Sequence, residues 1–90
     1  MIHGEITVSG VVQGVGFRYF TVQIARTFGI KGFVKNLPNG NVYCEAEADQ
    51  KVIRLFIKEL NVGPSMSRVT NVMVNEFKEL QNFQTFEVRY

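Results

Sequence analysis

The chain has 90 residues, of which 46% are hydrophobic and 20% are charged, and its formal net charge is +2. This length and balance leave room for one globular domain, so we expect a single domain over residues 1–90. The small charge gives no reason to expect a nucleic-acid partner, no apolar run approaches the ~20 residues needed to span a bilayer, and the N-terminus lacks the features of a signal peptide.

A strand, a glycine-containing turn and a helix open the chain. Apolar and polar residues alternate over residues 4–12, which predicts a strand. Gly14 and Gly16 break this period. From Phe17 apolar residues recur at helical spacing, which predicts a helix. Gly29 should end this helix, because glycine readily takes the left-handed conformation found just after a helix. The expected buried face of this helix consists of Phe17, Phe20, Ile24 and Phe28, with Thr21 and Ala25 beside it.

A hairpin and a second helix follow. An Asn-Gly pair at residues 39–40, between two strand-like runs, is a strong hairpin signal, so we expect strands near residues 31–37 and 41–48. Asp49 can cap a helix over about residues 50–61. The expected buried stripe of this helix consists of Val52, Phe56 and Leu60, with Ile53 and Leu55 beside them.

Two further strands complete the pattern. Valines between residues 69 and 74 predict one of them, and alternating Phe86, Val88 and Tyr90 predict the other. Strand, helix, hairpin, helix and strand, with one added C-terminal strand, is the split β-α-β order of ferredoxin-like α+β folds. Both helices should cover one face of a mainly antiparallel sheet. Such a fold does not by itself indicate a chemistry.

Two isolated residues have ordinary structural interpretations. Cys44 is the only cysteine, so it has no partner for an internal disulfide and no neighbours at zinc-ligand spacing. We expect it to be a small strand residue in a reducing, cytoplasmic environment. We expect His3 to be a near-terminal surface group.

The turn between the first strand and the first helix is a candidate anion site. The first amides of a helix have no internal partners, and Gly14 and Gly16 allow successive amides to point into one concavity. Arg18, in the first helical turn, opposes the helix dipole by about 0.3–1 kcal/mol unless an anion lies between them. An ordinary loop, with Arg18 reaching into water, would have the same pattern.

The sequence of this turn does not match the motifs of common nucleotide-binding and metal-binding sites. A P-loop needs Gly-Lys-Ser/Thr, and a dinucleotide fingerprint needs a third glycine where Tyr19 stands. No acidic pair near the turn could hold magnesium. The turn therefore matches neither of these nucleotide-binding motifs and offers no magnesium site.

Asn36 is a second candidate for this site. In a split β-α-β unit the first two strands run parallel through a right-handed crossover, so their C-terminal ends meet at one edge of the sheet. The glycine turn follows one of these ends and Asn36 lies at the other. Asparagine is also common where a strand enters a turn, so a structural role is compatible with the same position.

Two long segments resemble a known family. Residues 10–20, Gly-Val-Val-Gln-Gly-Val-Gly-Phe-Arg-Tyr-Phe, resemble the signature of the acylphosphatases, and residues 32–42 resemble the second motif of that family. The pair at residues 63–64, Gly-Pro, fits a third landmark, and the resemblance covers essentially the whole chain. The departures from the family pattern are Phe33 for a frequent tryptophan, Asn39 for a frequent aspartate, and Ala48 and Asp49 where glycine is common.

The resemblance implies hydrolysis of the carboxyl-phosphate bond of acyl phosphates to a carboxylate and inorganic phosphate, without metal or cofactor. Arg18 would be the catalytic arginine that binds the phosphoryl oxygens, and Asn36 would position the attacking water. The backbone amides expected to bind phosphate are those of Gly14, Val15, Gly16, Phe17 and Arg18.

We expect the partners to be small acyl phosphates, with inorganic phosphate acting as product and inhibitor, and the protein to be a monomer without membrane association. One alternative is a non-catalytic phosphate-binding module. Another is an RNA-binding module, because residues 31–34 faintly resemble part of an RNA-recognition strand. The first strand, however, offers Ile6 and Val8 rather than stacking aromatics.

Overall fold

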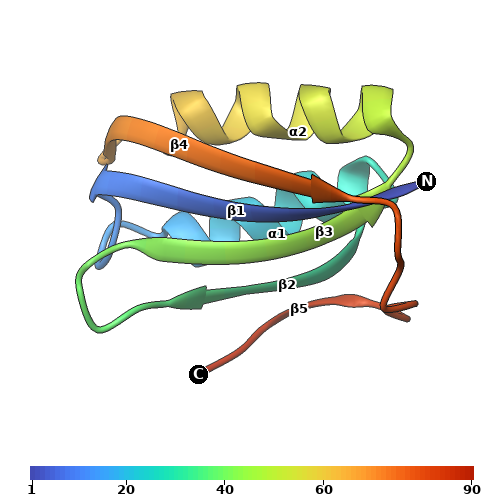
Figure 1. Ribbon diagram of the computed structural model, residues 1–90. Coiled ribbons are helices and arrows are strands. Elements are labelled where there is room, and N and C mark those ends of the chain that lie inside the picture. Colours follow the sequence, from blue (N-terminus) through green and yellow to red (C-terminus); the bar gives the residue numbers. More distant parts are fainter.

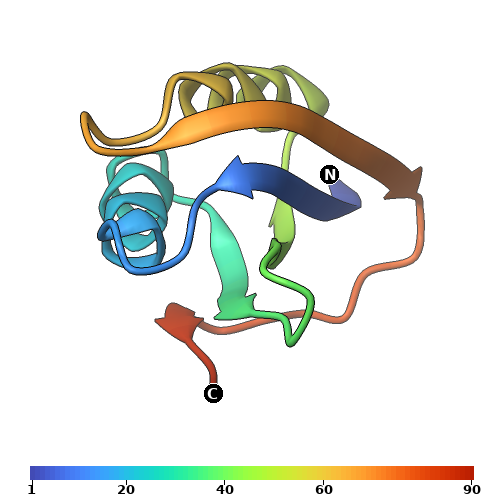
Figure 2. The ribbon, with the colours of Figure 1, turned by 90° about the vertical axis from the view of Figure 1, so that its left-hand side faces the viewer.

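Five strands form one sheet, and two helices cover one of its faces in the computed structural model, which describes residues 1–90 (Figures 1 and 2). In chain order the elements are β1 (Ile2–Val11), α1 (Phe17–Thr27), β2 (Lys31–Asn36), β3 (Val42–Ala48), α2 (Gln50–Val62), β4 (Arg68–Phe77) and β5 (Phe86–Val88). The spatial order is β4-β1-β3-β2-β5, and only β2 and β5 pair in parallel. The predicted α+β arrangement is confirmed.

The position of β3 fixes the direction of its two neighbours. Both β1 and β2 pair with β3 in antiparallel register, so they run parallel to each other, as predicted. Their C-terminal ends therefore lie at the same edge of the sheet, where the glycine turn and the β2–β3 loop are found. Neither helix combines the length and apolar character needed to cross a membrane.

The helix α1 buries a face slightly different from the predicted one. Phe17 and Ala25 are buried as expected, but Val22 is buried as well. The fully buried residues of α1 are Phe17, Thr21, Val22 and Ala25, whereas Phe20, Ile24 and Phe28 are only half-buried. In this core the Thr21 hydroxyl donates to the Phe17 carbonyl oxygen at 2.8 Å, which satisfies a buried polar group.

Two predictions about α2 are wrong. Ile53, Phe56 and Leu60 are buried as expected, but Leu55 is 51% exposed. Adjacent residues on a helix lie about 100° apart, so Leu55 points away from the sheet when Phe56 points toward it. Asp49 occupies the N-cap position, yet its side chain makes no capping hydrogen bond.

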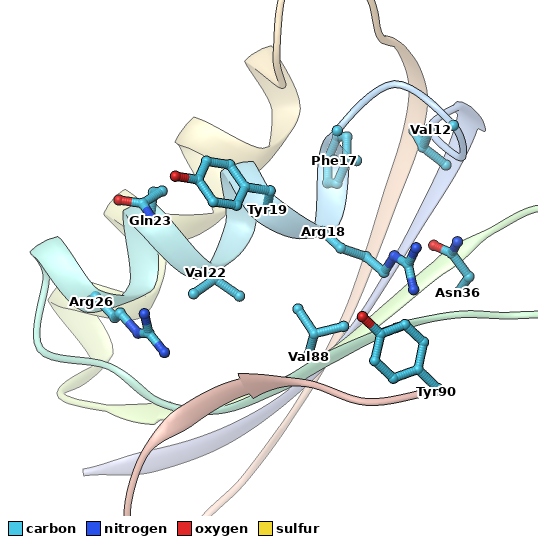
Figure 3. A pocket seen from close by; sticks show the side chains of 12 residues that line it. Val12, Phe17, Arg18, Tyr19, Val22, Gln23, Arg26, Asn36, Val88 and Tyr90 are labelled. Carbon is cyan, nitrogen blue, oxygen red and sulfur yellow. The ribbon is translucent and has the colours of Figure 1, made fainter.

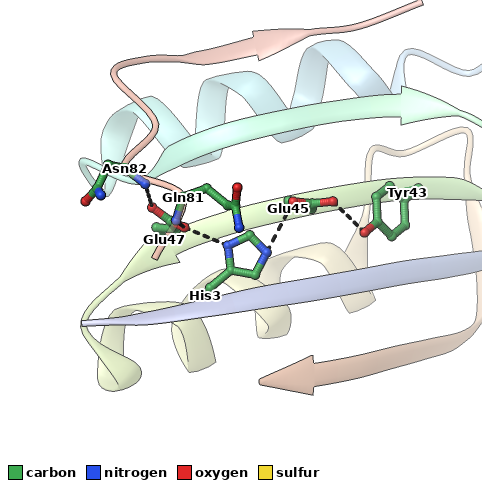
Figure 4. A network of polar contacts seen from close by, with 6 residues as sticks. All are labelled: His3, Tyr43, Glu45, Glu47, Gln81 and Asn82. Atoms are coloured by element: carbon green, nitrogen blue, oxygen red, sulfur yellow. Dashed lines mark hydrogen bonds and ion pairs between the residues drawn. The ribbon is translucent and has the colours of Figure 1, made fainter. Parts of the chain in front are cut away.

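The face of the sheet that carries no helix holds a buried polar network (Figure 4). His3 is only 4% exposed, so its assignment to the surface was wrong. The reason is that His3 already belongs to β1 and lies directly opposite Glu47 of β3. Its ring contacts two carboxylates, Glu47 through Nδ1 at 2.6 Å and Glu45 through Nε2 at 3.2 Å.

Glu47 is the centre of this network. Its carboxylate also accepts hydrogen bonds from the backbone amides of Gln81 at 2.5 Å and Asn82 at 3.0 Å. Burial alone raises the pKa of the Glu47 carboxyl, whereas the hydrogen bonds from Gln81 and His3 lower it. With the further amides of Asn82 and Phe83, they hold the pKa of Glu47 below its ordinary value of 4.5.

Acid should therefore destabilise the fold through Glu47. The unfolded chain regains the ordinary pKa, so ionised Glu47 adds to the free energy of unfolding above about pH 4.5. This contribution is lost as the pH falls through the lower pKa of the folded state. Because His3 and Glu45 belong to the same network, the matched comparison is Glu47→Gln. Urea unfolding should show a steeper loss of stability in acid for the parent chain than for Glu47→Gln, and equal slopes would contradict this account.

Candidate active site

A cavity of about 350 Å³ opens where β1 and β2 end and α1 begins (Figure 3). It contains the predicted residues Gly14, Gly16, Phe17, Arg18 and Asn36. Its complete lining is Val12, Gly14, Gly16, Phe17, Arg18, Tyr19, Val22, Gln23, Arg26, Asn36, Val88 and Tyr90. Among the expected site residues, Val15 alone is not part of this lining.

The turn before α1 has the backbone of an anion site. Gly14 and Gly16 have φ angles of 75° and 79°, in the left-handed region that disfavours side chains. Gly16 is the N-cap, and α1 has no side-chain cap and no acidic residue in its first turn. The first amide to find a backbone acceptor is that of Phe20, which donates to the Gly16 carbonyl oxygen at 3.0 Å. The preceding amides remain available for an anion.

Gln13, the first residue of the predicted phosphate-binding turn 13–18, ties this turn to the β2–β3 loop, a side-chain role that the sequence did not predict. The Gln13 side-chain amide donates to the carbonyl oxygens of Leu37 at 2.8 Å and Asn41 at 2.9 Å. These acceptors lie just beyond Asn36 in the chain, so the same contacts hold the turn and the end of β2 in a fixed relation. A glutamine before two glycines signals little by itself, because its partners are distant in sequence.

The side chains of Arg18 and Asn36 point toward one another across the cavity (Figure 3). Arg18 comes from the first turn of α1 and Asn36 from the last residue of β2. The Asn36 Oδ1 atom is buried and accepts no hydrogen bond from the protein. A buried acceptor without a donor costs about 1–3 kcal/mol, so Oδ1 is an acceptor that the protein itself leaves unpaired.

The cavity is positively charged. Arg18 and Arg26 line it, and no Asp, Glu, His or Cys does. Arg26 also donates through Nη2 to the Phe86 carbonyl oxygen at 3.3 Å, which links α1 to β5. The lining therefore favours an anion and offers no carboxylate, imidazole or thiolate to a metal ion.

The remaining titratable candidates lie elsewhere. The ligand atoms of His3, Glu5 and Glu45 lie within 4.8 Å of one another, a spacing that could hold a metal ion, but they are on the helix-free face near the start of β1. Cys44 is a buried residue of β3, as predicted, and burial raises the pKa of its thiol well above the usual range. None of these residues lines the cavity at Arg18.

Comparison with known proteins agrees with the sequence motifs. The acylphosphatase family model matches residues 4–88. An acylphosphatase of Archaeoglobus fulgidus is 49% identical over 90 residues, covering 100% of both chains, and one of Thermotoga maritima is 43% identical over 86 residues, covering 96% of this chain and 94% of its own. The crystal structure of acylphosphatase from Bacillus subtilis matches with a TM-score of 0.98 at 36% identity, covering 100% of both chains. The chain therefore belongs to the acylphosphatase family, whose enzymes hydrolyse acyl phosphates.

Proposed function

We propose that this chain hydrolyses acyl phosphates at the cavity between α1 and β2, with Arg18 and Asn36 in separate roles. The phosphoryl group binds between the amides of residues 14–18 and the Arg18 guanidinium, and Asn36 positions the attacking water. The supporting observation is that unpaired amides, a guanidinium and an unpaired Asn36 oxygen surround a single cavity.

The positive charge at the turn favours binding of the negatively charged phosphoryl group. The N-terminus of α1 carries a partial positive charge, and no acidic side chain in its first turn competes for it. Arg18 supplies a full charge and a planar fork that can donate to two phosphoryl oxygens. Charge spreads over the three equatorial oxygens in the transition state, so donors aimed at them stabilise it more than the ground state.

The Asn36 side chain can position the attacking water by a hydrogen bond. Its Oδ1 can accept a hydrogen bond from the water, which leaves a lone pair of the water oxygen free to attack phosphorus. A new bond forms between that oxygen and phosphorus, while the bond from phosphorus to the acyl oxygen breaks and its electron pair leaves with the carboxylate. The water proton passes to a phosphoryl oxygen, because no protein base lines the cavity.

The leaving group explains why no general acid is needed. A carboxylate is stable without protonation at neutral pH, since its ordinary pKa lies near 4. The mechanism thus requires neither a protein acid nor a metal or cofactor. The acyl group would lie along the rest of the cavity, where Val22 and Val88 provide apolar surface. Orthophosphate carries the same oxygens as the reacting group and should compete with the substrate.

Replacement of Arg18 tests the binding role. Arg18→Ala should lower kcat/KM for benzoyl phosphate by about 10³-fold or more, in the range of arginine contacts to transferring phosphoryl groups. It should also weaken inhibition by orthophosphate. Arg54→Ala, at an exposed position of α2, is the matched control and should change neither quantity. If the Arg18→Ala variant retained most of its activity, that result would contradict the proposed mechanism.

Replacement of Asn36 tests the water-positioning role. Asn36→Ala should cost about 2.7–4 kcal/mol of transition-state stabilisation, as for other single positioned polar groups. The loss should fall on kcat and leave orthophosphate inhibition nearly unchanged, because water rather than phosphate is displaced. Asn75→Ala, exposed on β4, serves as the control. If Asn36→Ala instead weakened orthophosphate binding as much as turnover, Asn36 would be a phosphate ligand.

A further inference from the structure

We propose that His3 and Glu47, at the end of the sheet opposite the Arg18 cavity, are positioning residues for the active site. They hold residues 81–83 in place and thereby fix β5, which forms one wall of the cavity. The inference rests on the proposed catalytic role of Arg18.

The sheet topology places β5 far from β4, so the position of β5 depends on the segment that connects them. β4 and β5 lie at opposite edges of the sheet, so residues 78–85 cross the ends of β1, β3 and β2 (Figures 1 and 2). That path covers four strand spacings, about 19 Å. β5 has only 3 residues and pairs with β2 alone. Such a short edge strand is weakly held by its own ladder, so its placement depends on how the crossing segment is anchored.

Glu47 anchors the crossing segment near its middle (Figure 4). Its carboxylate accepts the Gln81 amide at 2.5 Å and the Asn82 amide at 3.0 Å, while His3 holds the same carboxylate at 2.6 Å. Asn82 has a φ of 59°, the only positive value outside glycine, and such a conformation persists where its surroundings enforce it. The Phe83 ring stacks on the His3 ring at 5.9 Å.

Aromatic contacts continue this anchor toward β5. The edge of Phe83 packs against Phe33 of β2 at 5.8 Å. The guanidinium of Arg89, just after β5, lies over the Phe33 ring at 4.1 Å and over the Phe83 ring at 5.9 Å. Phe83 before β5 and Arg89 after it are therefore both packed on the Phe33 ring.

Backbone hydrogen bonds bracket the short pairing of β5 with β2. The Gly32 amide donates to the Thr85 carbonyl oxygen at 2.8 Å, and the Arg89 amide donates to the Val34 carbonyl oxygen at 2.9 Å. The second bond lies at the end of β5 nearer the cavity, so exchange of the Arg89 amide reports whether β5 is in place.

β5 then reaches the catalytic arginine. Val88 and Tyr90 line the cavity, and the Tyr90 ring centre lies 5.1 Å from Arg18 Cζ. Tyr90 follows β5 and its side chain is exposed, and a ring at this distance attracts the charge of the guanidinium. If β5 moves away, the cavity widens and Arg18 loses this neighbour.

Directional contacts explain why a buried, hydrogen-bonded polar pair is used here. An apolar side chain could cover the sheet, but it would allow residues 81–83 to slide. The Glu47 carboxylate accepts from two successive amides, which defines one position of the crossing segment. This role belongs to a positioning residue, since neither His3 nor Glu47 touches the cavity at Arg18.

Three variants test the proposal, each compared with the parent chain at a temperature where all are folded. Glu47→Gln removes the charge, and Phe83→Ala removes the aromatic contact without leaving a buried charge unpaired. Both should lower kcat/KM for benzoyl phosphate by about 2- to 30-fold, the usual range for coupling through a structural network, and both should accelerate exchange of the Arg89 amide. Gln50→Ala, the control, removes an exposed side-chain contact to Glu76 at 3.3 Å, away from this network, and should change neither quantity.

A double-variant cycle separates positioning from simple destabilisation. Tyr90→Ala alone should lower kcat/KM, and combining it with Glu47→Gln should give less than the product of the two separate losses, because both act through β5. Additive losses, or unchanged kcat/KM in both Glu47→Gln and Phe83→Ala, would overturn the proposal. An active Arg18→Ala would instead overturn the proposed function, and the Arg89 exchange rates would still report whether Glu47 anchors β5.

Discussion

The site depends on the unpaired backbone amides at the start of α1, which are free to donate hydrogen bonds to an anion. Gly14 and Gly16 take left-handed conformations there, and no side chain caps the helix. An anion bound to these amides reconciles Arg18 with the positive end of the helix dipole, which would otherwise repel it. In the proposed mechanism, the same turn that ends β1 and starts α1 binds the phosphoryl group.

The sheet supplies the second half of the site. Because β3 lies between β1 and β2, the ends of those two strands meet beside the turn, and Asn36 faces Arg18 across the cavity. Gln13 then fixes the turn against the β2–β3 loop through two hydrogen bonds. From the opposite end of the sheet, β5 delivers Val88 and Tyr90 to the same cavity. Three separate segments of the chain, residues 12–26, Asn36 and residues 88–90, therefore converge on the space that one substrate would fill.

Local patterns in the sequence predicted the elements and the turn, because glycine positions, alternation and helical spacing are determined by neighbouring residues. The nearness of Asn36 to Arg18 could also be predicted, since it follows from strand direction alone. The burial of His3 could not, because it depends on residues 78–85 crossing the sheet far along the chain. The hydrogen-bond partners of Gln13 could not be predicted either, because they lie in another loop. The exposure of Leu55 shows that apolar content does not define the exact limit of a buried helical face.

Titration of the ¹⁵N-labelled protein with orthophosphate tests most directly whether the turn before α1 and Arg18 bind the phosphoryl group. Orthophosphate presents the oxygens of the reacting group and leaves the acyl part of the cavity empty. The largest saturable shifts should appear at the backbone amides of residues 14–18 and at the Arg18 side chain. Shifts centred instead on the cavity beside His3 and Glu5, or none at residues 14–18, would contradict the account.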